Sequence, residues 1–138
     1  MGIKKLIVAV VIFNIIGCAT NINNPKNLEN INFYNYAYTI CMGSAFTDNE
    51  IKEDANRSAN GYMEYGNISL DAYQELRDRV DIWLNKDYMS KSGGSLQIMK
   101  CNDFYNSGDI QEIYQKYNPC KSSDSWLDAA DFDKQCGQ

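Results

Sequence analysis

The sequence contains no histidine, and that absence limits the chemistry open to the chain. Ser-His and Cys-His nucleophilic systems, histidine-ligated metals and the commonest general base near neutral pH all require an imidazole ring. No phosphate-binding loop is present either, because Gly93-Gly94 lacks the strand-loop-helix context and the lysine spacing that such loops need. We therefore expect a protein that is not an enzyme and binds no cofactor. A carboxylate-dependent hydrolase, with Glu64 or Asp71 as its acid or base, stays open as the catalytic alternative.

Basic residues are the minority among the charged side chains. The chain has 13 Lys and Arg against 18 Asp and Glu, a net charge of -5 at pH 7. Such an acidic chain is a poor ligand for nucleic acid or anionic lipid and a favourable one for a basic partner. We expect no nucleic-acid partner.

No apolar run in the sequence is long enough to span a bilayer, and the longest run lies at the N-terminus. Lys4 and Lys5 precede the apolar residues 6–13, a run too short to span a bilayer as a stable anchor, and this order is that of a signal peptide. We expect residues 1–17 to be removed on export. Since Lys4 and Lys5 are the only charged residues removed, the net charge changes from -5 to -7. About 120 residues remain, the common size of a single domain.

The apolar run ends in Ile15-Ile16-Gly17-Cys18-Ala19, which resembles a bacterial lipobox with Cys18 as the lipid-receiving residue. Cleavage before Cys18 would leave a lipid-anchored protein that contacts a membrane only through this anchor. Ala19 at the next position favours the outer membrane, with the domain facing the periplasm. The alternative is an ordinary signal peptide cut after a small residue, with Cys18 incidental.

Cysteines are few, and their number is even once Cys18 is assigned to lipid. Cys41, Cys101, Cys120 and Cys136 then remain of the five. In an oxidising periplasm they allow two disulfides in three possible pairings, with four free buried thiols as the alternative. No metal site is expected, because without a Cys-x-x-Cys pair or a histidine the ligands would have to be scattered thiolates.

No stretch alternates apolar and polar residues with a period of two, so we expect an all-α fold, a small bundle of about five helices. Apolar residues recur at three- and four-residue spacing instead. The second helix should bury the side that carries Ile51, Ala55, Ser58, Ala59 and Tyr62, and the fourth the side that carries Ile98, Cys101 and Tyr105. The helices are predicted over residues 31–46, from a Thr47 cap to near Gly66, from a Ser69 cap to about Asp87, over 96–105 and over 109–117, with Pro119 closing the last.

The predicted helices divide the mature chain into three parts. Residues 18–30 follow the signal peptide as a lipidated, Asn-rich and flexible tether without periodicity. Residues 31–118 form the helical domain, and residues 119–138 an acidic C-terminal extension. Within the domain, the segment Tyr88-Met89-Ser90-Lys91-Ser92-Gly93-Gly94-Ser95 interrupts the helical pattern, because adjacent glycines and serines favour a turn. A turn required only for folding is one interpretation, and a loop that enters a partner's cleft is the other.

Four segments together resemble a known family. They contain Gly-Tyr-x-Glu-x-Gly, Ser-Lys-Ser-Gly and Met-Lys-Cys in this order, a combination that is more specific than any one of its parts. They are Asn35-Tyr36-Ala37 with Cys41, then Ala59-Asn60-Gly61-Tyr62-Met63-Glu64-Tyr65-Gly66, then residues 88–93, and finally Leu96 through Met99-Lys100-Cys101 with Asp103 and Tyr105. In this order they resemble the fourth family of type VI secretion amidase immunity proteins, over residues 33–117.

The resemblance implies a helical, commonly dimeric protein that neutralises a secreted peptidoglycan amidase. That toxin is a papain-like cysteine peptidase, which cuts between D-glutamate and diaminopimelate and is injected into the periplasm by neighbouring cells. An exported helical chain without histidine is suited to such binding. A structural envelope lipoprotein and the carboxylate-dependent hydrolase remain the alternatives.

The inhibitory contact is expected in the loop that matches the family motif. Ser90, Lys91, Ser92 and Gly93 would enter or cover the amidase cleft near its catalytic cysteine, with Tyr88, Gly94 and Ser95 completing the contact. The acidic faces around Glu64, Asp71 and Asp78 are the alternative surface.

The same resemblance favours one of the three disulfide pairings. Cys41 is expected to pair with Cys101, because both lie on predicted apolar helix faces inside the family-like region. Cys120 would then pair with Cys136 inside the added tail.

Overall fold

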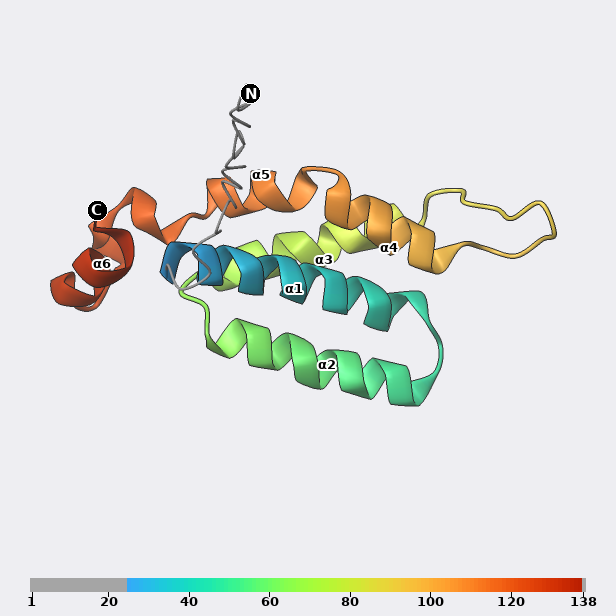
Figure 1. The fold of residues 1–138 in the computed structure, drawn as a ribbon, viewed down its shortest axis with the longest axis horizontal. Coiled ribbons are helices and arrows are strands. Elements are labelled where there is room, and N and C mark those ends of the chain that lie inside the picture. Colours follow the sequence, from blue (N-terminus) through green and yellow to red (C-terminus); the bar gives the residue numbers. More distant parts are fainter. Residues whose placement is uncertain (1–24, 138) are drawn as a thin grey trace, which may run out of the picture.

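The structure, a computed structural model, describes residues 25–137, so the expected signal peptide and the lipidation site Cys18 lie outside the described part. The described residues form α-helices and two short 3-10 helices, without a β-strand among them. The predicted all-α bundle is therefore confirmed (Figure 1). The helices are α1 (Pro25–Ala45), α2 (Asn49–Glu64), α3 (Leu70–Leu84), α4 (Gln97–Asn106), α5 (Asp109–Lys116) and α6 (Ala129–Cys136), with η1 (Pro119–Lys121) and η2 (Ser123–Ser125) before α6.

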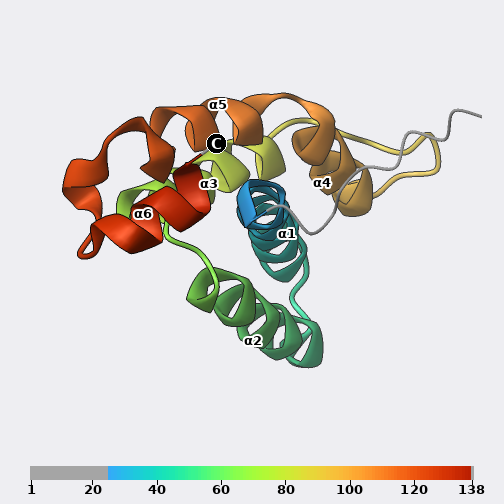
Figure 2. The ribbon, with the colours of Figure 1, turned by 60° about the vertical axis from the view of Figure 1, so that its left-hand side comes forward.

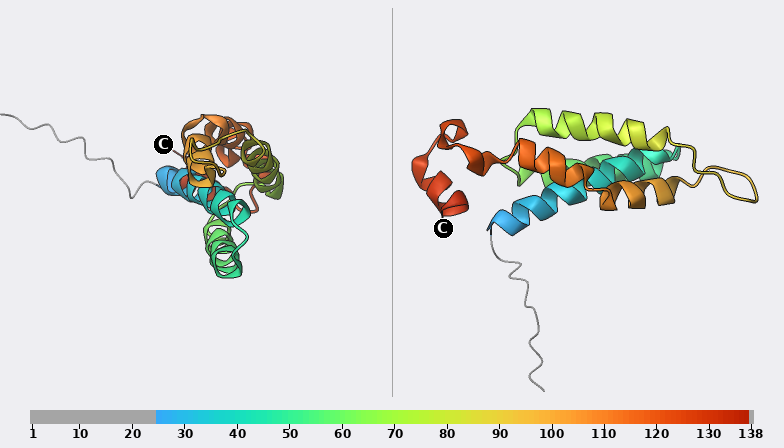
Figure 3. Two further views of the ribbon diagram at one scale, coloured as in Figure 1. Left: turned by 90° about the vertical axis from the view of Figure 1, so that its right-hand side faces the viewer. Right: turned by 90° about the horizontal axis from the view of Figure 1, so that it is seen from above.

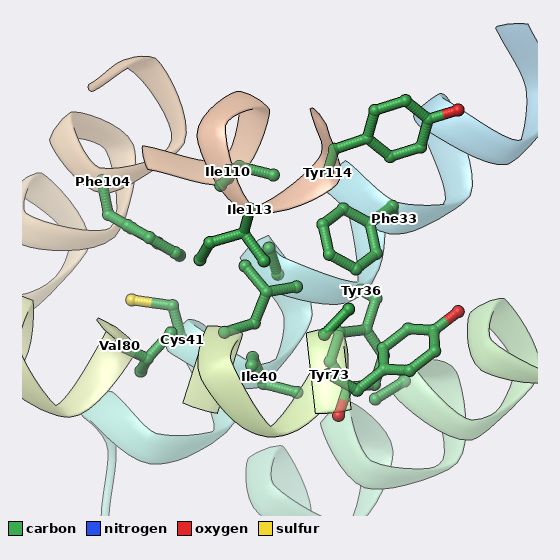
Figure 4. Packing of buried hydrophobic residues seen from close by; sticks show 14 of the residues in the cluster. Phe33, Tyr36, Ile40, Cys41, Tyr73, Val80, Phe104, Ile110, Ile113 and Tyr114 are labelled. Carbon is green, nitrogen blue, oxygen red and sulfur yellow. The ribbon is translucent and has the colours of Figure 1, made fainter. Parts of the chain in front are cut away.

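Helix α1 is the centre of the fold. It contacts each of the other α-helices, and in Figure 2 it lies between α2 on one side and α3, α4 and α5 on the other. Burial of each large apolar side chain contributes about 1.5–3 kcal/mol, so the core between α1, α3, α4 and α5 is the main source of stability. Figure 4 shows this core, which includes Phe33, Tyr36, Ala37, Ile40, Cys41, Leu76, Val80, Phe104, Ile110 and Ile113.

Helix α1 begins at Pro25 and not at Ile31, so residues 25–30 of the expected tether are helical. Proline is favoured in the first turn of a helix because its missing N–H would have no partner there. A contact of Glu29 with a distant part of the chain also stabilises this first part of α1. The Glu29 side chain is buried, and Oε1 accepts a hydrogen bond of 2.7 Å from the backbone N–H of Asn67 in the α2–α3 connection.

Helix α2 packs mainly on α1, through small residues. A Cβ at Gly43 of α1 would lie 2.7 Å from Cβ of Ala55, so only glycine allows this close approach. Ala55 and Ala59 are the buried residues of α2. The expected core position Ile51 is 42% exposed and Tyr62 is only partly buried. Because α2 packs on essentially one other helix, it buries fewer residues around its circumference than the spacing of its apolar residues predicts.

Helix α4 buries only part of the predicted face, at Cys101. Lys100, Cys101 and Phe104 are buried, whereas Ile98 is 55% exposed and Tyr105 lies at the surface. The Cys41–Cys101 disulfide joins α1 to α4 and turns this face of α4 toward the core. The prediction that Ile98 and Tyr105 belong to the core is therefore wrong.

The C-terminal extension forms a small unit at the end of the molecule opposite the α3–α4 connection (Figure 1). The second disulfide joins Cys120 to Cys136, so both bonds follow the pairing favoured by the sequence. The indole N–H of Trp126 donates to the Pro119 carbonyl at 3.0 Å, and its ring meets Phe132 edge-on. Among residues 25–137, none of the helices combines the length and the hydropathy that a transmembrane span requires.

Candidate functional site

The connection between α3 and α4 forms a hairpin, residues 88–96, which projects beyond the helical body (Figure 1). Figure 3 shows the projection from a second direction. An antiparallel bridge between Met89 and Ser95 closes its base, and as part of this bridge Leu96 N–H donates to the Tyr88 carbonyl at 2.8 Å. These contacts bring together the ends of the segment that the sequence marked as a turn. The predicted contact residues therefore lie on one projecting element.

The tip of the hairpin is ordered by its own hydrogen bonds. Ser90 N–H donates to the Gly94 carbonyl and Gly93 N–H to the Ser90 carbonyl, each at 3.0 Å. The hydroxyl oxygens of Ser90 and Ser92 lie 2.8 Å apart, and Ser92 N–H donates to Ser90 Oγ. Lys91, Ser92, Gly93 and Gly94 are exposed. A partner would therefore meet a tip whose backbone conformation is already formed.

The two glycines have a conformational role. Gly93 and Gly94 have φ angles of 87° and 89°, in the left-handed region that side-chain-bearing residues rarely adopt. A Cβ added at either position would meet no atom within 4 Å. The backbone angle, and not the available space, is therefore what requires glycine here.

Two side chains of α4 attach the hairpin to the helical body. Tyr88 Oη donates to Asp103 Oδ2 at 2.9 Å, and this hydrogen bond to a carboxylate raises the pKa of Tyr88. Lys100, only 4% exposed, donates from Nζ to the Leu84 carbonyl at 2.6 Å. Leu84 is the last residue of α3, where carbonyls lack intrahelical partners and a cation is favourable. Lys100 therefore fixes the point where α3 ends and the chain turns toward the hairpin.

A second set of contacts fixes the C-terminal half of α3 against α5. Asp109, in the first turn of α5, accepts a hydrogen bond of 2.7 Å from the Trp83 indole and pairs with Arg79 at 3.3 Å. The disulfide between Cys41 and Cys101 holds α4 on α1. Both helices that flank the hairpin are thus held by polar or covalent contacts as well as by the core, and the hairpin stands on a rigid base.

Several exposed apolar side chains lie at the base of the hairpin and the start of α4, and their exposure was not foreseen from the sequence. Met89 is 59% exposed, Leu96 37%, Ile98 55% and Met99 52%. A hollow of about 420 Å³ lies beside them, between Phe46 after α1 and the start of α4. The sequence does contain a sign of this exposure, because three of the four residues at positions 96–99 are apolar. In the first turn of a helix they point in different directions, so they cannot all face the core.

The carboxylates considered for catalysis lie apart from this element. Glu64 is the last residue of α2, Asp71 lies in the first turn of α3, and both are exposed. Asp78 is exposed on α3 and accepts a hydrogen bond from Gln74. Among residues 25–137 no group of three or more His, Cys, Asp or Glu side chains could hold a metal ion. The most prominent feature of the described residues is therefore the hydrogen-bonded hairpin that projects from the helical body.

The helical domain matches a known protein family. Residues 31–114 match a family model, Tai4, described as type VI secretion system (T6SS) amidase immunity protein. The matched region contains α1 from Ile31 onward, α2 to α4, the whole hairpin, and α5 up to Tyr114, and it stops before the C-terminal extension. None of the curated proteins matches the chain.

Proposed function

Because this chain belongs to the family of type VI secretion system amidase immunity proteins, we propose that it neutralises its amidase by placing the hairpin, residues 88–96, in the substrate cleft of that enzyme. The observation that carries this proposal is the projection of a hydrogen-bonded hairpin from a rigid base. Ser90, Lys91, Ser92 and Gly93 enter or cover the cleft near the catalytic cysteine. Tyr88, Gly94 and Ser95 hold and complete the contact.

The physical argument for this placement is preorganisation. An inhibitor that must order a loop on binding loses part of its interaction free energy to conformational entropy. The bonds between Ser90 and Gly94 and between Ser90 and Gly93 exist in the free protein, so less entropy is lost when the tip docks. Small side chains and two glycines also keep the tip narrow, which suits entry into a cleft built for an extended peptide.

We further propose where and against what the protein acts. The target is a peptidoglycan amidase that cuts between D-glutamate and diaminopimelate in the periplasm, and the immunity protein reaches it as an exported chain anchored to the outer membrane through Cys18. Two disulfides support an oxidising compartment. Homodimer formation is part of the same proposal, and light scattering after size exclusion measures it directly.

The test of the hairpin placement must separate binding from folding. We would replace Ser90, Lys91 and Ser92 together with alanine and measure inhibition of the cognate amidase on purified peptidoglycan. Inhibition should weaken at least about tenfold, which corresponds to roughly 1.4 kcal/mol. The immunity protein alone in the same assay shows whether it has hydrolase activity of its own.

A matched control places three alanines on the exposed face of α2, at Lys52, Asn56 and Asn60. This variant should inhibit like the parent, and both variants should melt like the parent. Full inhibition by a folded hairpin variant would move the contact elsewhere, most directly to the acidic faces around Glu64, Asp71 and Asp78.

A further inference from the structure

We use the name apolar shoulder for four exposed apolar residues at the base of the hairpin and the start of α4 together with the partly buried Phe46, which lines a hollow beside α4: Met89, Leu96, Ile98, Met99 and Phe46. We propose that the apolar shoulder is the second half of the amidase-binding surface, and that it receives apolar side chains from the rim of the cleft that holds the hairpin tip. This inference rests on the proposed function of the hairpin. It assigns the surface from which most of the affinity comes.

The first argument is geometric. From the bonded pair Tyr88 and Leu96 to the tip, the chain runs three to four residues in each direction, which is about 10–13 Å in extended conformation. A cleft as deep as this length therefore brings its rim to Leu96. Leu96 belongs to the apolar shoulder and also lines the hollow beside it. A partner that encloses the whole length of the hairpin therefore contacts the apolar shoulder.

The second argument concerns the chemistry of the tip. Serine, lysine and glycine form hydrogen bonds with water in the free protein and exchange them for similar bonds in a complex, so each contributes little net affinity. The strong contributions in protein interfaces come from a few apolar or aromatic side chains buried at the centre and surrounded by polar contacts. The tip has no such side chain. The anchor must lie elsewhere, and the apolar shoulder is next to it.

The third argument is that the fold leaves these side chains uncovered. Met89, Ile98 and Met99 are each more than half exposed, although helix α4 has a core face available. The hollow of about 420 Å³ beside them is lined by Phe46, Leu96 and Ile98 among others, so a side chain of a partner can enter it. Exposed apolar side chains grouped beside a hollow are typical of an interaction site.

The experiment measures binding to the cognate amidase with its nucleophilic cysteine replaced by alanine. Ile98→Ser combined with Met99→Ser should raise Kd at least about twentyfold, because two half-exposed apolar side chains lose their burial. The matched control is Leu70→Ser combined with Leu127→Ser, two highly exposed leucines at the start of α3 and in the C-terminal extension. It should change Kd less than about threefold. A parental Kd for the Ile98 and Met99 variant would overturn the proposal.

Two controls keep the result interpretable. If the serine pair melts clearly below the parent, Ile98→Lys combined with Met99→Lys replaces it, because lysine keeps the helix propensity of α4. Light scattering then gives the oligomeric state. A change of that state in the variant would assign the apolar shoulder to a second copy of the chain and overturn its assignment to the amidase.

The hairpin triple variant, measured in parallel, separates this inference from the proposed function. Weak binding by the triple variant with parental binding by the shoulder variant would reject the apolar shoulder and leave the hairpin placement intact. Parental binding by both would reject the two together. Weak binding by the shoulder variant alone would keep the apolar shoulder as the docking surface and reject the hairpin placement.

Discussion

The two disulfides should differ sharply in their effect on the stability of the core. Cys41 and Cys101 are fully buried, join α1 to α4 and are separated by 60 residues, whereas Cys120 and Cys136 are separated by 16 residues within the extension. Loop-closure entropy alone would give about 4 kcal/mol for the first bond and about 3 kcal/mol for the second. The two bonds, however, constrain different parts of the molecule. Pro119 is the one buried residue among the described side chains of the extension, so the second bond should stabilise the extension alone.

The two tryptophans allow the core and the extension to be followed separately. Trp83 lies beside the core and is hydrogen-bonded to Asp109, and Trp126 lies in the extension. A Trp126→Phe background therefore reports the core by fluorescence, and a Trp83→Phe background reports the extension. In urea unfolding, Cys41→Ala combined with Cys101→Ala should lower the free energy of unfolding of the core by about 4 kcal/mol.

The extension pair provides the contrast. Cys120→Ala combined with Cys136→Ala should change the free energy of unfolding of the core by less than about 1 kcal/mol, while the Trp126 signal is lost at lower urea. Equal destabilisation of the core by the two double variants would refute the reasoning, because the extension would then be part of the same cooperative unit.

Two further predictions concern buried charged side chains. Burial raises the pKa of the Glu29 carboxyl above its ordinary value near 4.5, and the hydrogen bond from Asn67 opposes this shift. The folded state therefore binds the carboxyl proton more tightly than the unfolded state does. As a result, the free energy of unfolding falls as pH rises through the pKa of Glu29. Glu29→Gln keeps an oxygen for the Asn67 N–H and should have a higher melting temperature than the parent near pH 7. Below about pH 4 this difference in melting temperature should become smaller. A difference that does not change with pH contradicts the argument. Lys100→Met removes the donor to the Leu84 carbonyl and should lower the free energy of unfolding by about 1–2 kcal/mol and weaken amidase binding, because the base of the hairpin loosens. Unchanged urea unfolding and Kd would show that the Lys100 contact does not position the hairpin.

The helices from α2 to α5 could be placed from the sequence because their apolar residues recur at helical spacing and turn residues separate them. Local signals were less reliable at the ends. Thr47 was expected to cap α2, but Asp48 does so, accepting a hydrogen bond from the Ile51 N–H at 3.1 Å. The start of α1 could not be seen because the Asn-rich lead has no periodicity, and the bond between Glu29 and Asn67 is a contact between distant segments.

The surface around the candidate site was harder to predict than the hairpin itself. Adjacent glycines and serines are a local signal for a turn, and Gly93 and Gly94 have the positive φ angles that explain it. The exposure of Ile98 and Met99 depends on how α4 is rotated, and the Cys41–Cys101 bond and the burial of Lys100 set that rotation. The sequence singled out Lys100 only as a member of the Met-Lys-Cys motif. Its role at the end of α3 requires the three-dimensional contact with Leu84.

The most direct test of the central claim is disulfide trapping between the hairpin tip and the catalytic cysteine of the amidase. Ser92→Cys places a thiol at the exposed tip, and Asn56→Cys places one on the exposed face of α2 as a control. If the tip lies in the cleft, mild oxidation of the complex should give a covalent adduct with the Ser92→Cys protein that disappears when the nucleophilic cysteine of the amidase is replaced by alanine. An adduct that forms equally with Asn56→Cys, or no adduct from Ser92→Cys within a stable complex, would contradict the placement of the hairpin in the cleft.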